Sequence, residues 1–68
     1  MNFLYQDMRS ASGRFLAHSE KQTVGGRTVY VLQLIDLSSG AVNQQSFNDW
    51  NTYSQRYDMM RTVILPFK

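Results

Sequence analysis

Residues 28–37 decide the fold, and they read Thr-Val-Tyr-Val-Leu-Gln-Leu-Ile-Asp-Leu. Successive side chains of a strand point to opposite faces. Here both faces are apolar: one carries Tyr30, Leu32 and Leu34, and the other carries Val29, Val31 and Ile35. The stretch therefore predicts a central strand, covered by a helix on one face and by a curled sheet or a partner on the other.

The chain before this strand predicts a hairpin and one further short strand. Residues 14–24 alternate in the manner of a strand, with Phe15 and Ala17 on one face and Leu16, His18 and Glu20 on the other. Gly25-Gly26 then separates two strand-like runs, and a type I′ turn requires positive φ at both of its central residues. Residues 1–8 predict a short first strand, followed by a polar loop at 10–13.

The chain after this strand predicts a turn, a short return strand over 41–45, and a helix. At 100° per residue from Phe47, Trp50 lies at about −60°, Tyr57 at about −80° and Tyr53 at about −120°, which is an amphipathic stripe over residues 46–57. Ser46 suits the N-cap, and Asp49 stands where a capping box places its acid. Residues 59–67 predict a final strand that Pro66 ends.

These elements predict a single α+β domain over residues 1–68, in the order β-β-β-(β)-α-β. We expect an antiparallel sheet of four to five strands with one helix, about 46–57, packed on one face. The same order is compatible with a small β-barrel that has one helix before its last strand.

Composition excludes several classes of protein. The 68 residues are 43% hydrophobic and 18% charged, which is too apolar for a disordered tail. The absence of cysteine excludes disulfides, thiolate zinc sites and iron–sulfur clusters, and it favours an intracellular, cytoplasmic protein. The longest apolar stretches are far too short for a membrane helix, and the N-terminus lacks the basic region of a signal peptide.

Catalysis is not expected. The chain has one histidine, His18, whose neighbour Ser19 faces the other side of the strand, whereas Glu20 shares its face and can hold the imidazole ring. The five carboxylates fall in different elements. Two glycine-containing loops, 10–14 and 23–27, end in arginine but match no phosphate-binding motif. We therefore expect no enzyme activity, no cofactor, no metal and no small-molecule substrate.

Binding is the remaining class of function. Nine aromatic residues are more than so small a core encloses, and we expect Phe15, Phe47 and Trp50 to fill it. Exposed aromatic side chains beside arginines are typical of protein interfaces. The candidate partner-binding residues are therefore Tyr5, Arg9, Arg14, Arg27, Tyr30 and Tyr53.

Two kinds of partner fit this pattern. The first hypothesis is a small module that binds a larger protein, or a second copy of itself, and regulates or inhibits it, in the manner of compact phage or mobile-element effectors. A sheet edge at residues 62–65 would serve this binding. The alternative is a barrel-like module for single-stranded nucleic acid, with phosphates bound by Arg9, Arg14, Lys21 and Arg27 and bases stacked on Tyr5, Phe15 and Tyr30.

Overall fold

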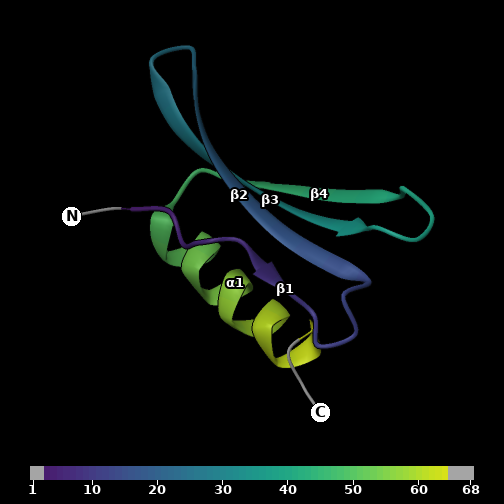
Figure 1. Ribbon diagram of the computed structural model, residues 1–68. Coiled ribbons are helices and arrows are strands. Elements are labelled where there is room, and N and C mark those ends of the chain that lie inside the picture. Colours follow the sequence, from purple (N-terminus) through teal and green to yellow (C-terminus); the bar gives the residue numbers. More distant parts are fainter. Residues whose placement is uncertain (1–2, 65–68) are drawn as a thin grey trace.

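The computed structural model describes residues 3–64 and consists of one antiparallel sheet and one helix (Figure 1). The elements are β1 (Met8–Arg9), β2 (Phe15–Val24), β3 (Arg27–Asp36), β4 (Val42–Phe47) and α1 (Trp50–Ile64). The strands lie side by side in chain order, β1-β2-β3-β4. The predicted α+β fold is confirmed. The sheet is open, so the barrel alternative does not describe this chain.

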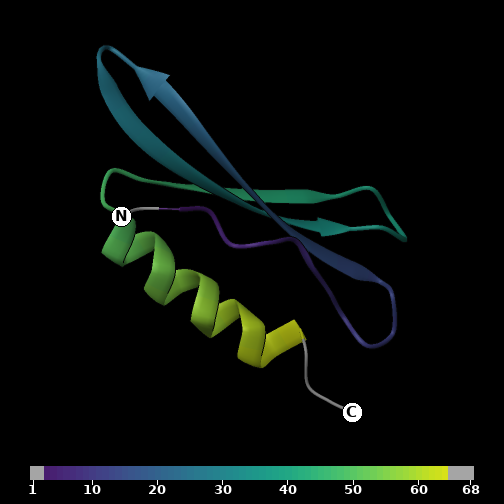
Figure 2. The same cartoon turned by 60° about the vertical axis from the view of Figure 1, so that its left-hand side comes forward.

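The β2–β3 hairpin is the longest paired unit, and the sequence predicted it. Its register runs from Phe15 opposite Asp36 to Val24 opposite Arg27. Gly25 and Gly26 join the strands with φ of 59° and 79°, values that an L side chain rarely adopts. The far half of the hairpin extends beyond the other elements as an arm (Figure 2), and residues 20–28 of this arm are all exposed.

The predicted helix exists, but both of its ends differ from the prediction. Phe47 belongs to β4, and the cap is Asp49, whose Oδ2 accepts from the Thr52 N–H at 3.0 Å. Ser46, the predicted cap, lies within β4. A carboxylate that reaches the third helical N–H is the usual N-cap arrangement, so the helix begins one turn later than its amphipathic stripe suggested.

The predicted final strand over 59–67 is wrong, because residues 59–64 continue α1. Short apolar runs fit a strand and a buried helix equally well. No glycine or proline stands between Gly40 and Pro66 to end the helix. The Thr62 hydroxyl donates to the Met59 carbonyl at 2.7 Å, a bond that a helical threonine makes. The remainder of the predicted strand, 65–67, lies outside the described residues.

The predicted first strand over 1–8 is shortened to β1, and residues 1–2 lie outside the described part. Residues 3–6 instead run beside α1, held by its aromatic side chains (Figure 1). Their backbone bonds are Trp50 Nε1 to the Phe3 carbonyl at 2.6 Å, the Tyr5 N–H to Tyr53 Oη at 2.9 Å, and Tyr57 Oη to the Gln6 carbonyl at 2.7 Å. The bonds of Tyr53 and Tyr57 are partly buried, so they offset the loss of water by these polar groups, whereas the Trp50 bond lies at the exposed end of the segment.

The core is built around tyrosines. Its buried members are Met8, Ala17, Tyr30, Leu32, Tyr53 and Tyr57. Tyr53 is completely buried, and its ring stacks on that of Tyr30 with the centroids 5.6 Å apart. Phe15, Phe47 and Trp50, which the sequence placed at the centre, pack as partly buried residues around this cluster.

The other face of the sheet has no element packed on it among residues 3–64. Val31 is nevertheless 2% exposed, because it lies in the middle of this face between Glu20 on β2 and Ser46 on β4. The helix therefore covers one face of β3, as predicted. The predicted second cover is absent from the described part of the chain.

Tyr53 and Tyr30 form a matched pair for testing this core. Removing the Tyr53 hydroxyl leaves the Tyr5 N–H and the Ser19 hydroxyl without their partner, so Tyr53→Phe should lower the free energy of unfolding by about 1–3 kcal/mol. Tyr30 Oη makes no bond within residues 3–64, and Tyr30→Phe should change stability by less than about 0.5 kcal/mol. Urea unfolding measures both; equal losses would contradict this account.

The two candidate caps can be separated in the same way. Asp49→Ala removes the acceptor of the Thr52 N–H and should lower the free energy of unfolding by about 0.5–2 kcal/mol. Ser46→Ala alters an exposed strand residue and should stay within about 0.5 kcal/mol. The reverse order in urea unfolding would show that the helix begins where the sequence placed it.

Candidate protein-binding edge

Strand β4 forms one edge of the sheet. It pairs with β3 on one side only, from Val42 opposite Ile35 to Phe47 opposite Tyr30, with no break in register. Every residue of β4 except Phe47 is exposed. Edge strands are usually guarded by a charge, a proline, a bulge or very short length. The sequence Val-Asn-Gln-Gln-Ser-Phe has no charge and no proline, and its six-residue pairing has no bulge.

The free hydrogen-bonding groups of β4 belong to three residues. The Asp36 N–H donates to the Ala41 carbonyl at 2.8 Å, so Asp36 and Ala41 bond directly. Antiparallel strands alternate between residues that bond to the neighbour and residues that point away from it. Continued along β4, this alternation directs the N–H and C=O groups of Val42, Gln44 and Ser46 outward from the sheet.

Two rows of side chains run to this edge across the open face, which is the face of the sheet that the helix does not cover. Leu16, Ile35 and Val42 lie opposite one another and form an apolar row across β2, β3 and β4. The neighbouring row is polar and places His18 opposite Gln33, and Gln33 opposite Gln44. The Gln33 amide donates to Gln44 Oε1 at 2.9 Å, which fixes the side chain at the middle of the edge.

His18 continues the polar row toward β1 and binds two carboxylates. Its Nδ1 is 2.9 Å from Asp7 Oδ1, and its Nε2 is 3.2 Å from Glu20 Oε2. Both ring nitrogens can donate only when the imidazole is protonated. The hydrogen bond to Asp7, and secondarily that to Glu20, raises the pKa of His18 above its ordinary value of 6.5. The predicted His18–Glu20 pair is confirmed, and Asp7 is a partner that the sequence did not reveal.

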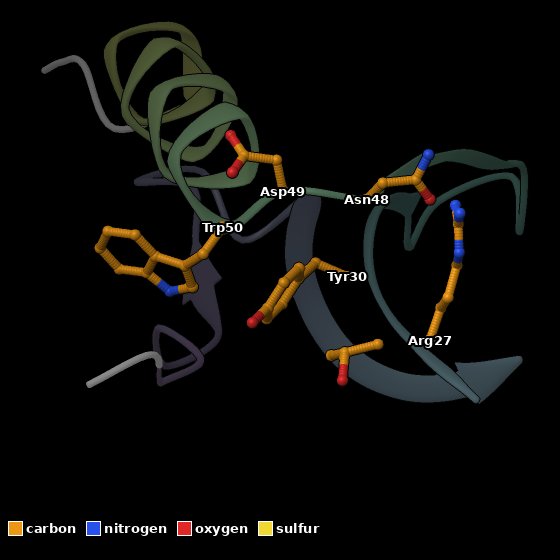
Figure 3. A pocket seen from close by; sticks show the side chains of 6 residues that line it. Arg27, Tyr30, Asn48, Asp49 and Trp50 are labelled. Atoms are coloured by element: carbon orange, nitrogen blue, oxygen red, sulfur yellow. The ribbon is translucent and has the colours of Figure 1, made fainter.

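An open notch lies beyond the end of β4. It has a volume of about 430 Å³ and is lined by Arg27, Thr28, Tyr30, Asn48, Asp49 and Trp50 (Figure 3). Asn48 and Asp49 directly follow β4, and the other wall is the start of β3. The Tyr30 hydroxyl reaches this notch. The hydroxyls of Tyr5, Tyr53 and Tyr57, in contrast, are bonded within the chain.

Two of the three predicted aromatic contact residues lie in the core. Tyr30 and Tyr53 are 5% and 0% exposed, so their predicted role as exposed binding residues is wrong for this fold. Tyr5 is half-buried, and its ring stacks on Tyr57 with centroids 4.5 Å apart. Tyr53 and Tyr57 belong to the core because they lie on the face of α1 that packs against the sheet and the N-terminal segment.

The predicted arginines do not gather into one surface. Arg14 is held by Asp36 through Nη2–Oδ2 and Nε–Oδ1 distances of 3.0 and 3.3 Å. This bond lowers the pKa of Asp36 to about 2. Arg9 pairs with Leu16 and Arg27 with Val24. Eight residues of extended strand separate those positions, about 27 Å.

The sequence also placed the free sheet edge in the wrong segment. It predicted an edge at 62–65, but residues 62–64 are helical, and the edges of the described sheet are the two-residue β1 and the six-residue β4. The sequence did predict a short return strand over 41–45, after the turn at Ser38-Ser39-Gly40, and the structure extends it to Val42–Phe47. Only the strand order identifies that run as an edge.

Two features are absent from the part of the chain that the structure describes. Residues 3–64 contain no cluster of three His, Cys, Asp or Glu side chains arranged to hold a metal ion. Within the same range, no helix is long and apolar enough to cross a membrane. Comparison with protein-family models, with curated proteins and with solved structures found no match to this chain.

The pKa of His18 predicts a pH dependence of stability. A pKa that folding raises means that the folded chain binds the proton more tightly than the unfolded chain. The added stability is complete below pH 6.5 and is lost as the pH rises through the folded pKa. Urea unfolding should therefore give a lower free energy at about pH 8 than at about pH 6.

Two variants locate the cause of this dependence. Because the Asp7 bond raises the pKa most, Asp7→Asn should lower the pKa of His18 more than Glu20→Gln does. An NMR titration of the imidazole ring measures both shifts. A His18 pKa at or below 6.5 in the unaltered chain would refute the assignment.

Proposed function

We propose that this chain is a small non-enzymatic protein-binding module that takes an extended segment of a larger intracellular protein onto the free edge of β4. An added strand bonds through its main chain and is selected through alternate side chains. The observation that carries the proposal is the unguarded edge: six paired residues without a charge, a proline or a bulge.

The surroundings of β4 support this mode of binding. Val42, Gln44 and Ser46 direct main-chain donors and acceptors outward, which fixes the register of an added strand. Side chains of that strand on the open face lie beside the exposed Val42 and the bonded Gln44. A segment that continues past Phe47 meets the notch with its Arg27 and Tyr30 groups. Main chain, open face and notch thus offer backbone, apolar and polar contacts in turn.

Regulation or inhibition of the partner follows from the same geometry. A partner segment that adds to β4 is held extended and is withdrawn from its other contacts. Single-stranded nucleic acid has weaker support, because such binding uses a continuous basic groove with exposed aromatic rings. Here Arg14 is bonded to Asp36, and Tyr30 and Tyr53 are buried.

A substitution at one position distinguishes main-chain recognition from a general surface effect. In Gln44→Pro the outward N–H is lost, whereas Gln44→Ala keeps it and removes only the side chain. Proline is tolerated on an edge strand when its position faces solvent. The tagged full-length chain and both variants are used to capture partners from lysate of the source or host, with and without nuclease, after circular dichroism shows that all three are folded.

The expected result is a stoichiometric protein that survives nuclease, is retained by Gln44→Ala and is lost with Gln44→Pro. Retention by the proline variant would contradict binding at this edge. Companions that disappear after nuclease treatment would indicate nucleic acid as the partner.

A further inference from the structure

We propose that β4 pairs with β4 of a second copy of this chain, antiparallel and about a two-fold axis that passes between the two Gln44 residues. This inference rests on the proposed use of the β4 edge and names a second copy as its occupant. The resulting sheet would be continuous through both copies, with the two helices on the same side.

The outward groups of β4 complement themselves about Gln44. In antiparallel pairing, opposed residues of the outward set exchange two hydrogen bonds each. An axis at Gln44 opposes Gln44 to Gln44 and, on either side, Val42 of one copy to Ser46 of the other. Every outward N–H of the strand then meets an outward C=O. A register displaced by two residues leaves one member of the set without a partner, so the centred pairing is preferred.

Side chains at the axis extend this complementarity. Gln44 Oε1 accepts from Gln33 at 2.9 Å, which leaves the Gln44 amide NH₂ free to donate. A carboxamide oxygen accepts two hydrogen bonds, so each Gln44 can donate to the Oε1 of the other. The polar row on the open face would thereby continue across the axis.

The helix side of β4 is equally compatible with a second copy. In the same register Asn43 of one chain lies opposite Gln45 of the other, again a pair of uncharged amides. Arg56 donates to Gln45 Oε1 at 3.3 Å and lies over the Phe47 ring with its guanidinium carbon 5.9 Å from the centroid. This arginine beside β4 is thus held against its own chain. Like charges commonly prevent identical edges from pairing, and β4 carries none.

The size of the interface sets the strength of association. Six residues of edge bury less than the roughly 1,200 Å² at which standard interfaces begin. Association should therefore be weak, with a dissociation constant in the micromolar range or above. A pairing of that strength keeps the edge covered at high concentration and lets a tighter-binding partner segment displace the second copy.

Sedimentation equilibrium of the full chain, from about 10 μM to about 1 mM, tests the inference. The apparent mass should rise from the 7.9 kDa of the monomer toward twice that value. Gln44→Lys places two like charges at the axis and should raise the dissociation constant at least about tenfold. The matched control is Gln22→Lys, which adds the same charge at an exposed position on β2.

Hydrogen exchange measured by NMR reports on the edge itself. The amides of Val42, Gln44 and Ser46 should exchange more slowly at high concentration in the unaltered chain, and should lose this protection in Gln44→Lys. A 7.9 kDa species at every concentration would overturn the inference, as would a dimer that Gln44→Lys leaves intact.

The same measurements separate this inference from the proposed function. If the chain stays monomeric at every concentration and its partner is lost only in Gln44→Pro, self-pairing is refuted and partner binding at β4 is supported. A dimer that is abolished by Gln44→Lys, combined with partner capture that Gln44→Pro leaves unchanged, would support self-pairing and refute the proposed partner site.

Discussion

The Tyr53 hydroxyl is the contact on which the remaining architecture depends. It accepts from the Tyr5 N–H at 2.9 Å and donates to Ser19 Oγ at 2.8 Å, so one oxygen joins the N-terminal segment, the helix and β2. The ring that carries it is fully buried and stacks on Tyr30 of β3. Because a buried hydroxyl without partners is costly, these bonds determine how the helix lies on the sheet. The aromatic residues Trp50 and Tyr57 then fix the same segment one helical turn to either side.

One helix of this size covers one face of the sheet, and this limit explains what remains open. A chain of 68 residues buries a smaller fraction of its surface than a larger domain does. The helix and the N-terminal segment occupy the face that carries Tyr30 and Leu32. The opposite face is left with a row of apolar residues, and β4 is left with one neighbour. The candidate binding edge is thus a consequence of how the few available elements are distributed.

The sequence predicted an element correctly where its residues are compatible with only one local structure. Gly25-Gly26 predicted the hairpin because both positions need positive φ, and β3 was predicted from a run that is apolar on both faces. The end of the helix was missed because the short apolar runs at 59–60 and 63–65 suit either a strand or a helix, and Pro66 is the first helix-breaking residue after Gly40. The stripe was also centred wrongly. Counting Phe47 as helical moved Tyr53 to its border, whereas adding Met60, at about −140° on the same scale, places Tyr53 inside the stripe between Tyr57 and Met60.

The candidate site was less predictable than the fold, because an edge is a property of neighbours. The sequence Val-Asn-Gln-Gln-Ser-Phe would be unremarked in a central strand, where both sets of main-chain groups are bonded. It becomes informative when the strand order leaves one set free and no charge protects it. The predicted arginines and tyrosines had the residue types of an interface, yet the fold uses Arg14 to hold Asp36 and Tyr53 to hold the core. Composition therefore predicted binding as the class of function, whereas the strand order reveals that β4 presents an uncharged six-residue row of main-chain groups at an edge.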